Sequence, residues 1–193
     1  MKSIDWDAGR WTNQPASVRE EGTDLLVTAV EGSDAWRTTS YGFVHDTEHA
    51  LVVPLENGRA VEVDFVAEFS EQFDQAGVFL RADDRHWIKA GVEFVDGAPQ
   101  VGAVVTWPNS DWSASPVPGW AGRTVTIRAS RSGDAVTFRA GVDGQLALIR
   151  LAPVPPDATL EAGPMVCAPT RAGLTVRFTG WRETAADASL HDQ

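Results

Sequence analysis

Residues 73–112 read FDQAGVFLRADDRHWIKAGVEFVDGAPQVGAVVTWPNSDW. Three runs in which aliphatic residues alternate with polar residues and glycines occur there: 74–81, 87–95 and 98–106. This alternation is the pattern of half-buried β-strands. The pair Asp96-Gly97 separates the last two runs, and both residue types tolerate the positive φ of a tight hairpin turn. The segment therefore predicts three antiparallel strands joined by two hairpins.

The hairpin turns determine which residues face one another. A two-residue turn pairs Val95 with Ala98, and a loop over 82–86 pairs Arg81 with Trp87. A slip of one residue would place charged groups among aliphatic ones, so the alternation selects this register. One face then carries only aliphatic side chains, which are Ala76, Val78, Leu80, Ile88, Ala90, Val92, Val101, Ala103 and Val105. We expect that face to form the core between two sheets.

The opposite face of the three strands carries four cross-strand rows. They are Gln75–Glu93–Gln100, Gly77–Gly91–Gly102, Phe79–Lys89–Val104 and Arg81–Trp87–Thr106. A row without side chains predicts a shallow groove, flanked by polar groups on one side and by cationic and aromatic groups on the other. Two interpretations remain open. The face is either a ligand-binding groove or a scaffold, in which the glycines permit sheet curvature and the polar and cation–π contacts are structural.

Similar strand patterns continue along the rest of the chain. Alternating residues span 61–69, 124–128, 135–139 and 174–178. Turn signals occur at Asn57-Gly58, Ser132-Gly133-Asp134 and Asp143-Gly144, and no long window has helical periodicity. The sequence therefore predicts an all-β protein, a sandwich or barrel in a single domain over residues 1–183. The polar, Ala-rich residues 184–193 are expected to form a flexible tail.

The composition excludes several classes of protein. The chain has 193 residues and a formal net charge of −11, which disfavours the counterion-release binding of nucleic acids. No apolar run approaches the ~20 residues of a membrane span, and the N-terminus lacks the apolar segment of a standard signal peptide. We therefore expect a cytoplasmic protein that binds neither nucleic acid nor membrane. The lone Cys167 excludes an internal disulfide or a cysteine metal cluster.

Catalytic and metal-binding patterns in the sequence are weak. Glu62, Asp64 and Glu68 share one face, but strand positions four to six residues apart lie ~13–20 Å apart, too far for a pair of glycosidase carboxylates. His45 and His49 have no obvious third metal ligand and fit a polar loop. No Gly-x-Ser-x-Gly elbow and no phosphate loop occurs. We predict no catalytic residue, metal site or cofactor.

The central strands resemble a known family. Phe73–Asp84 and Trp87–Glu93 are similar to the core signature of the domain of unknown function 1349 family, which includes the regulation-of-enolase-type proteins. Further matches are Val105-Thr106, Ser110–Ser113, Asp143-Gly144 and Gly163–Pro169, so that the resemblance extends from Trp36 to about Trp181. It implies a jelly-roll β-sandwich of two curved antiparallel sheets, as in the concanavalin A-like lectins and glucanases. It implies little about activity.

The tryptophans add to the functional interpretation. Indole faces stack on sugar rings while carboxylates, amides and lysines bond sugar hydroxyls, although most of the indoles can equally be core fillers. The first hypothesis is a non-catalytic domain that binds a carbohydrate or similar polyhydroxylated ligand on the concave sheet. Its predicted ligand-binding residues are Gln75, Arg81, Trp87, Lys89, Glu93, Gln100, Asp111 and Trp112. The alternatives are a regulatory domain that binds a metabolic enzyme, as the resemblance suggests, and a hydrolase or lyase that uses Glu93 with Lys89 or Arg81.

Overall fold

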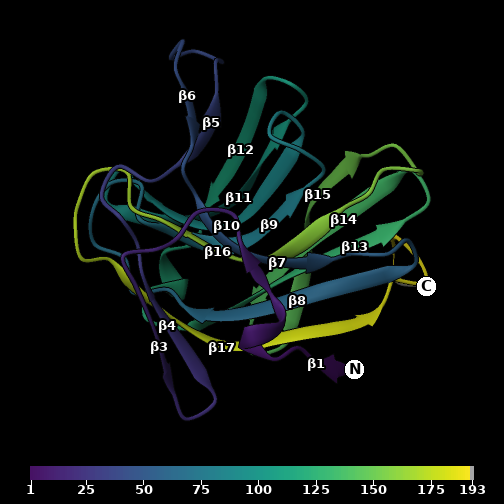
Figure 1. Ribbon diagram of the computed structural model, residues 1–193, viewed down its shortest axis with the longest axis horizontal. Helices are drawn as coiled ribbons and strands as arrows, with labels where there is room; N and C mark the ends of the chain where they lie inside the picture. Colours follow the sequence, from purple (N-terminus) through teal and green to yellow (C-terminus); the bar gives the residue numbers. More distant parts are fainter. Residues whose placement is uncertain (192–193) are drawn as a thin grey trace.

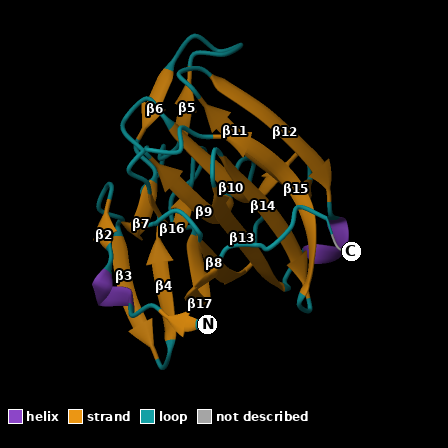
Figure 2. Ribbon diagram, turned by 90° about the vertical axis from the view of Figure 1, so that its right-hand side faces the viewer, coloured by secondary structure: helices purple, strands orange, loops and turns teal. Residues whose placement is uncertain are grey.

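The computed structural model describes residues 1–191 and consists of two large antiparallel sheets packed face to face (Figures 1 and 2). The prediction of an all-β, concanavalin A-like jelly-roll sandwich is confirmed. Among the described residues, the helical segments are two 3₁₀ turns, Trp6–Ala8 and Pro118–Trp120. Neither of them has the length or the apolar character that crossing a membrane requires.

We call the two large sheets the back sheet and the groove sheet. The back sheet has the order β15 (Gln145–Pro153), β14 (Ala135–Val142), β13 (Thr124–Ser132), β8 (Arg59–Val66), β17 (Thr175–Ala185), β4 (Asp24–Thr28), β3 (Ser17–Glu21), with β1 (Lys2–Ser3) on β17. The groove sheet has the order β12 (Ser110–Pro116), β11 (Ala98–Thr106), β10 (Trp87–Val95), β9 (Gln75–Arg81), β16 (Glu161–Cys167), β7 (His49–Pro54), β2 (Arg10–Trp11). A separate two-stranded hairpin consists of β5 (Ala35–Arg37) and β6 (Val44–Asp46).

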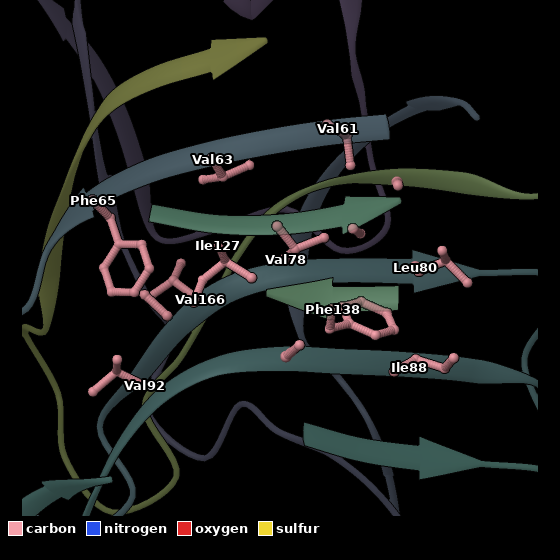
Figure 3. Close-up of a cluster of buried hydrophobic side chains, with 14 of the residues drawn as sticks. Val61, Val63, Phe65, Val78, Leu80, Ile88, Val92, Ile127, Phe138 and Val166 are labelled. Atoms are coloured by element: carbon pink, nitrogen blue, oxygen red, sulfur yellow. The ribbon is translucent and has the colours of Figure 1, made fainter. Parts of the chain in front are cut away.

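The predicted register of β9, β10 and β11 is confirmed at every pair. Gly91 pairs with Gly77 and Gly102, so the glycine row lies across three strands. All nine aliphatic side chains assigned to one face are buried in the core, none more than 9% exposed. Figure 3 shows side chains of both sheets in this core, including Val63, Phe65, Ile127 and Phe138 of the back sheet and Val78, Leu80, Ile88 and Val92 of the groove sheet.

The glycine row has a structural cause that the sequence left open. A Cβ atom built on Gly91 would lie 2.2 Å from the Ala76 carbonyl oxygen, and one on Gly77 would lie 2.1 Å from the Ala90 carbonyl oxygen. Neighbouring main chains therefore approach too closely for any side chain, which is the packing that glycine alone permits. The row allows the strands to come together on the outer face of the groove sheet, and a floor without side chains follows from it.

The described residues after β17 are joined to the back sheet, and residues 192–193 of the expected tail lie outside the described residues. β17 ends at Ala185, so the expected domain boundary between residues 183 and 184 falls inside a strand. Asp187 lies between Arg128 and Arg139, at 2.8 and 3.0 Å from their Nε atoms. Arg139 also donates a hydrogen bond to the main-chain oxygen of Leu190 (2.7 Å). Residues after the last strand thus continue to contact β13 and β14.

Candidate binding groove

The β5–β6 hairpin projects from the sandwich beside β11 and β12 (Figures 1 and 2). The end of β5 is attached to the groove sheet, where the Arg37 amide donates to Ser110 Oγ of β12 (2.9 Å). Its aromatic side chains form a continuous series: Trp36 contacts Tyr41 edge-on (ring centroids 5.6 Å apart), Tyr41 stacks on Phe43 (5.2 Å) and Phe43 contacts His45 (4.6 Å). Tyr41 and Phe43 are 59% and 42% exposed. The hairpin therefore presents an aromatic wall to the solvent.

A groove lies between this wall and β12, on the outer face of the groove sheet. Trp112 of β12, which is 40% exposed, forms the opposite side. The cavity beside the hairpin encloses about 340 Å³ and continues into a narrow trench over the glycine row, floored by Gly91 and Gly102. Val104 and Met165 complete the floor. Aromatic side chains of the hairpin and of β12 thus line one cavity over a floor of main chain and small apolar groups.

A polar network connects the floor of the groove to the hairpin. Lys89, only 6% exposed, donates from Nζ to Asp34 Oδ1 and to Gln75 Oε1, both at 2.8 Å. The Gln75 amide, 3% exposed, donates to Glu93 Oε1 (3.2 Å) and to the Phe73 carbonyl oxygen (3.2 Å). Lys89 and Gln75 are therefore occupied by neighbours. Their role is to hold the half-buried carboxylates of Asp34 and Glu93, which line the cavity.

The network sets the protonation of its charged groups. Burial raises the pKa of Glu93 to about 7; Lys89 opposes this rise and Asp34 adds to it. Burial lowers the pKa of Lys89, but the carboxylates of Asp34 and Glu93 outweigh that effect and keep the pKa above its usual value. Lys89 is therefore a permanent cation near neutral pH. Glu93 can be either a hydrogen-bond donor or an acceptor for a bound ligand.

The structure brings together five of the eight predicted ligand-binding residues. Those that line the groove are Gln75, Lys89, Glu93, Gln100 and Trp112. Trp87 lies on the expected face but is 2% exposed, packed on Phe79 under the base of the hairpin. Arg81, beside it, lines a different cavity. Asp111 pairs with core-facing Val105 and is bonded to Arg150 on the side of β12 away from the groove, because its parity is opposite to that of Trp112.

Sequence reasoning missed the hairpin, which supplies four groove residues. These are Trp36, Tyr41, Phe43 and His45, and Asp34, which also lines the groove, directly precedes β5. Tyr41, Phe43 and His45 alternate with period two, and this alternation is the signal that could have identified a strand with an aromatic face. That the strand folds over β10 and β11 rather than joining a sheet edge was not encoded in any local pattern.

The other candidate sites have structural roles. Glu62 and Asp64 lie on the outer face of the back sheet, where Arg182 forms ion pairs with both and Arg128 bonds Glu62 (2.8 Å). His49 is buried; its Nε2 accepts from the Val30 amide and its Nδ1 contacts the Asn13 carbonyl oxygen. Among the described residues no group of three or more His, Cys, Asp or Glu side chains is placed to hold a metal ion.

Comparisons with known proteins place the chain in one family. The family described as "Protein of unknown function (DUF1349)" matches residues 11–186. "Regulation of enolase protein 1" from Saccharomyces cerevisiae is 36% identical over 193 residues, which cover 99% of this chain and 97% of that protein. A crystal structure of a functionally unknown protein from Saccharomyces cerevisiae superposes with a TM-score of 0.89 at 34% identity, covering 96% of this chain and 100% of the other.

More distant structures share the fold alone. A xylan β-1,4-xylosidase from Bacillus halodurans C-125 superposes with a TM-score of 0.71 at 15% identity. The match covers 95% of this chain but only 39% of the xylosidase chain. This similarity identifies the β-sandwich and carries no information on activity.

Proposed function

We propose that this chain, which belongs to the DUF1349 family of proteins of unknown function, binds a neutral carbohydrate in its groove without cleaving it. The observation that carries the proposal is that Trp112 and the hairpin aromatics line one cavity together with polar groups of its floor. Sugar rings offer apolar C–H faces and a rim of hydroxyls, which match these two kinds of surface.

Each part of the groove has a counterpart on a sugar. The exposed faces of Trp112 and Tyr41 are available for stacking. Glu93 and Asp34 can accept hydrogen bonds from hydroxyls, and the Gln100 amide provides both donor and acceptor. Lys89 is already bonded within the network, so it leaves no free cation for an acidic sugar. Two carboxylates in the groove and a net charge of −11 favour neutral over anionic glycans.

Tryptophan fluorescence and calorimetry with neutral oligosaccharides test the proposal. We expect saturable binding that weakens at least tenfold in Trp112→Ala, because stacking on the indole is lost. Trp107→Ala is the matched control: Trp107 is 36% exposed but contacts His86 outside the groove. Equal loss in both variants, or no binding of any neutral glycan across an array, would contradict the proposal.

The same glycans separate binding from catalysis. A hydrolase or lyase would need Glu93 as an acid or base beside Lys89, and its raised pKa is compatible with that use. We expect no depolymerisation by the wild-type protein. Glycan cleavage that disappears in Glu93→Gln would show that the groove is catalytic.

A regulatory role is the second candidate, favoured by the relative named for regulation of enolase. The exposed hairpin, with Tyr41, Phe43 and Val44 at 59%, 42% and 47% exposure, is the surface for such a partner. Purified enolase mixed with this protein should then co-elute in a fixed ratio and change in activity. Phe43→Ser should abolish both effects, while a chain that never co-elutes with enolase excludes this candidate.

A further inference from the structure

A second cavity of about 200 Å³ lies on the other side of the hairpin base, and the groove shares none of its lining residues. It is bounded by β9 and the start of β10, the residues after β2, the end of β6 with the β6–β7 connection, and the loop after β9. Glu48 and Arg81 line it, together with Asp46 and Asp84 at the rim and Trp87 in the wall. The proposed function uses none of these residues.

Glu48 is a buried carboxylate that no cation pairs with among the described residues. It is 5% exposed. The Thr12 hydroxyl and the Glu48 main chain bond the carboxylate and lower its pKa, and Thr12 Oγ1 also lies 3.0 Å from the Glu48 main-chain oxygen. A buried carboxylate without a cationic partner is costly for the fold, so its presence at a cavity needs a cause.

Arg81 lines the same cavity and, in the described part of the chain, also lacks an ion pair. Within residues 1–191 its guanidinium forms no ion pair and donates no hydrogen bond. Glu161, its cross-strand neighbour on β16, is bonded to Arg10 instead (2.6 Å). Arg81 acts on Glu48 through its charge but lies outside ion-pair distance. Opposite charges therefore line one small cavity without touching one another.

We infer that this cavity binds a small zwitterion of the size of an α-amino acid, whose ammonium bonds Glu48 and whose carboxylate bonds Arg81. A ligand with both charges provides a partner for each unpaired group, and charge-assisted hydrogen bonds are the strong ones. A purely anionic ligand could bond Arg81, but it would be repelled by the carboxylates of Glu48, Asp46 and Asp84. A purely cationic ligand would leave Arg81 as it is. The cavity volume of about 200 Å³ is sufficient for a ligand of this size.

Calorimetry with L-alanine, L-serine and L-leucine tests the inference. We expect at least one of them to bind with a Kd below about 1 mM. Its amide, which keeps the ammonium, and its N-acetyl derivative, which keeps the carboxylate, should each bind at least tenfold more weakly. Equal binding of the amide, equal binding of the N-acetyl compound, or no binding of any of the three amino acids would overturn it.

Matched variants locate the site. Glu48→Gln and Arg81→Gln should each weaken amino-acid binding at least tenfold, whereas the exposed Glu56→Gln and Arg85→Gln should leave the Kd unchanged. Loss of binding in the control variants as well would contradict the assignment. Trp112→Ala should bind the amino acid normally and Glu48→Gln should bind glycans normally, so failure of one proposal is distinguishable from failure of the other.

Proton release gives a readout that a structural role of Glu48 would not produce. Burial raises the pKa of Glu48 to about 7; the Thr12 hydroxyl and Arg81 lower it, and Asp46 raises it. Asp84 is the remaining charged group of the lining. Because an ammonium binds only the ionised carboxylate, binding at pH 7 should release about half a proton, seen as a buffer-dependent enthalpy. Glu48→Gln should abolish that dependence, and a buffer-independent enthalpy in the wild type would contradict the contact with Glu48.

Discussion

Strand packing alone accounts for the glycine row. At Gly91 the added Cβ would lie 2.2 Å from one main-chain oxygen and 2.9 Å from Gly77 Cα, and neither atom belongs to a side chain that could move away. The glycine is therefore required by strand packing whether or not a ligand binds. The trench is a consequence of that packing.

Gly91→Ala should accordingly lower the free energy of unfolding by about 1–3 kcal/mol, the usual cost of forcing an extra carbon into a close-packed site. Gly119→Ala is the control, because nothing lies within 4 Å of its Cβ and its φ is not positive; it should be neutral or stabilising by about 0.4–1 kcal/mol. Urea denaturation of both variants measures the difference. Equal stability of the two would mean that the sheet relaxes around the added group.

At the scale of elements, β9, β10 and β11 could be predicted in detail while the β5–β6 hairpin could not. In the three strands a turn dipeptide, a period of two and an all-aliphatic face agree, and only one register satisfies all three. Trp87 instead belongs to a buried cluster with Ala35 and Ala50, which come from segments far away in the sequence. The floor of the groove is thus encoded locally, whereas its wall and cover depend on long-range packing.

The segment after β17 shows how an exposed-looking tail is held by charge. Both Asp187 oxygens are bonded by arginines, and its amide donates to Ser130 Oγ (2.8 Å). Burial raises the pKa of Asp187, but Arg128 and Arg139 outweigh that effect and keep the pKa below its usual value. This carboxylate therefore stays ionised and paired over the whole neutral range.

Asp187→Ala should release the segment and lower the free energy of unfolding by about 1–3 kcal/mol, below the ~3–5 kcal/mol of a fully buried pair. Hydrogen exchange of the amides of residues 186–190 should accelerate, with little change in the core strands. The exposed Asp157→Ala is the control and should change neither quantity. Unchanged exchange in Asp187→Ala would mean that the ion pairs do not hold the segment.

At the scale of the whole molecule, the ionisable groups divide into two sets with opposite pH dependence. Asp74 and Asp187 have lowered pKa values, so the stability they contribute is present above about pH 4 and is lost as the pH falls further. Glu48 and Glu93 have pKa values raised to about 7 against an ordinary 4.5. Their contribution is fully present below pH 4.5 and is lost as the pH rises through 7.

These two sets predict a stability maximum near pH 5 and a decline towards pH 8, against the usual optimum of proteins at higher pH. The decline from Glu48 alone is about 3 kcal/mol, taken from the raised pKa of a side chain that is almost fully buried. His49 opposes it, because burial lowers its pKa and its stabilising effect is lost as the pH falls below 6.5, but one histidine acts against two glutamates. Denaturation at pH 5 and pH 8 measures the decline in the free energy of unfolding. The decline should largely disappear in the double variant Glu48→Gln/Glu93→Gln. It should persist in the wild type and in the exposed control Glu56→Gln. A wild-type protein more stable at pH 8 than at pH 5 would show that the carboxyl groups of Glu48 and Glu93 are solvated in the folded protein.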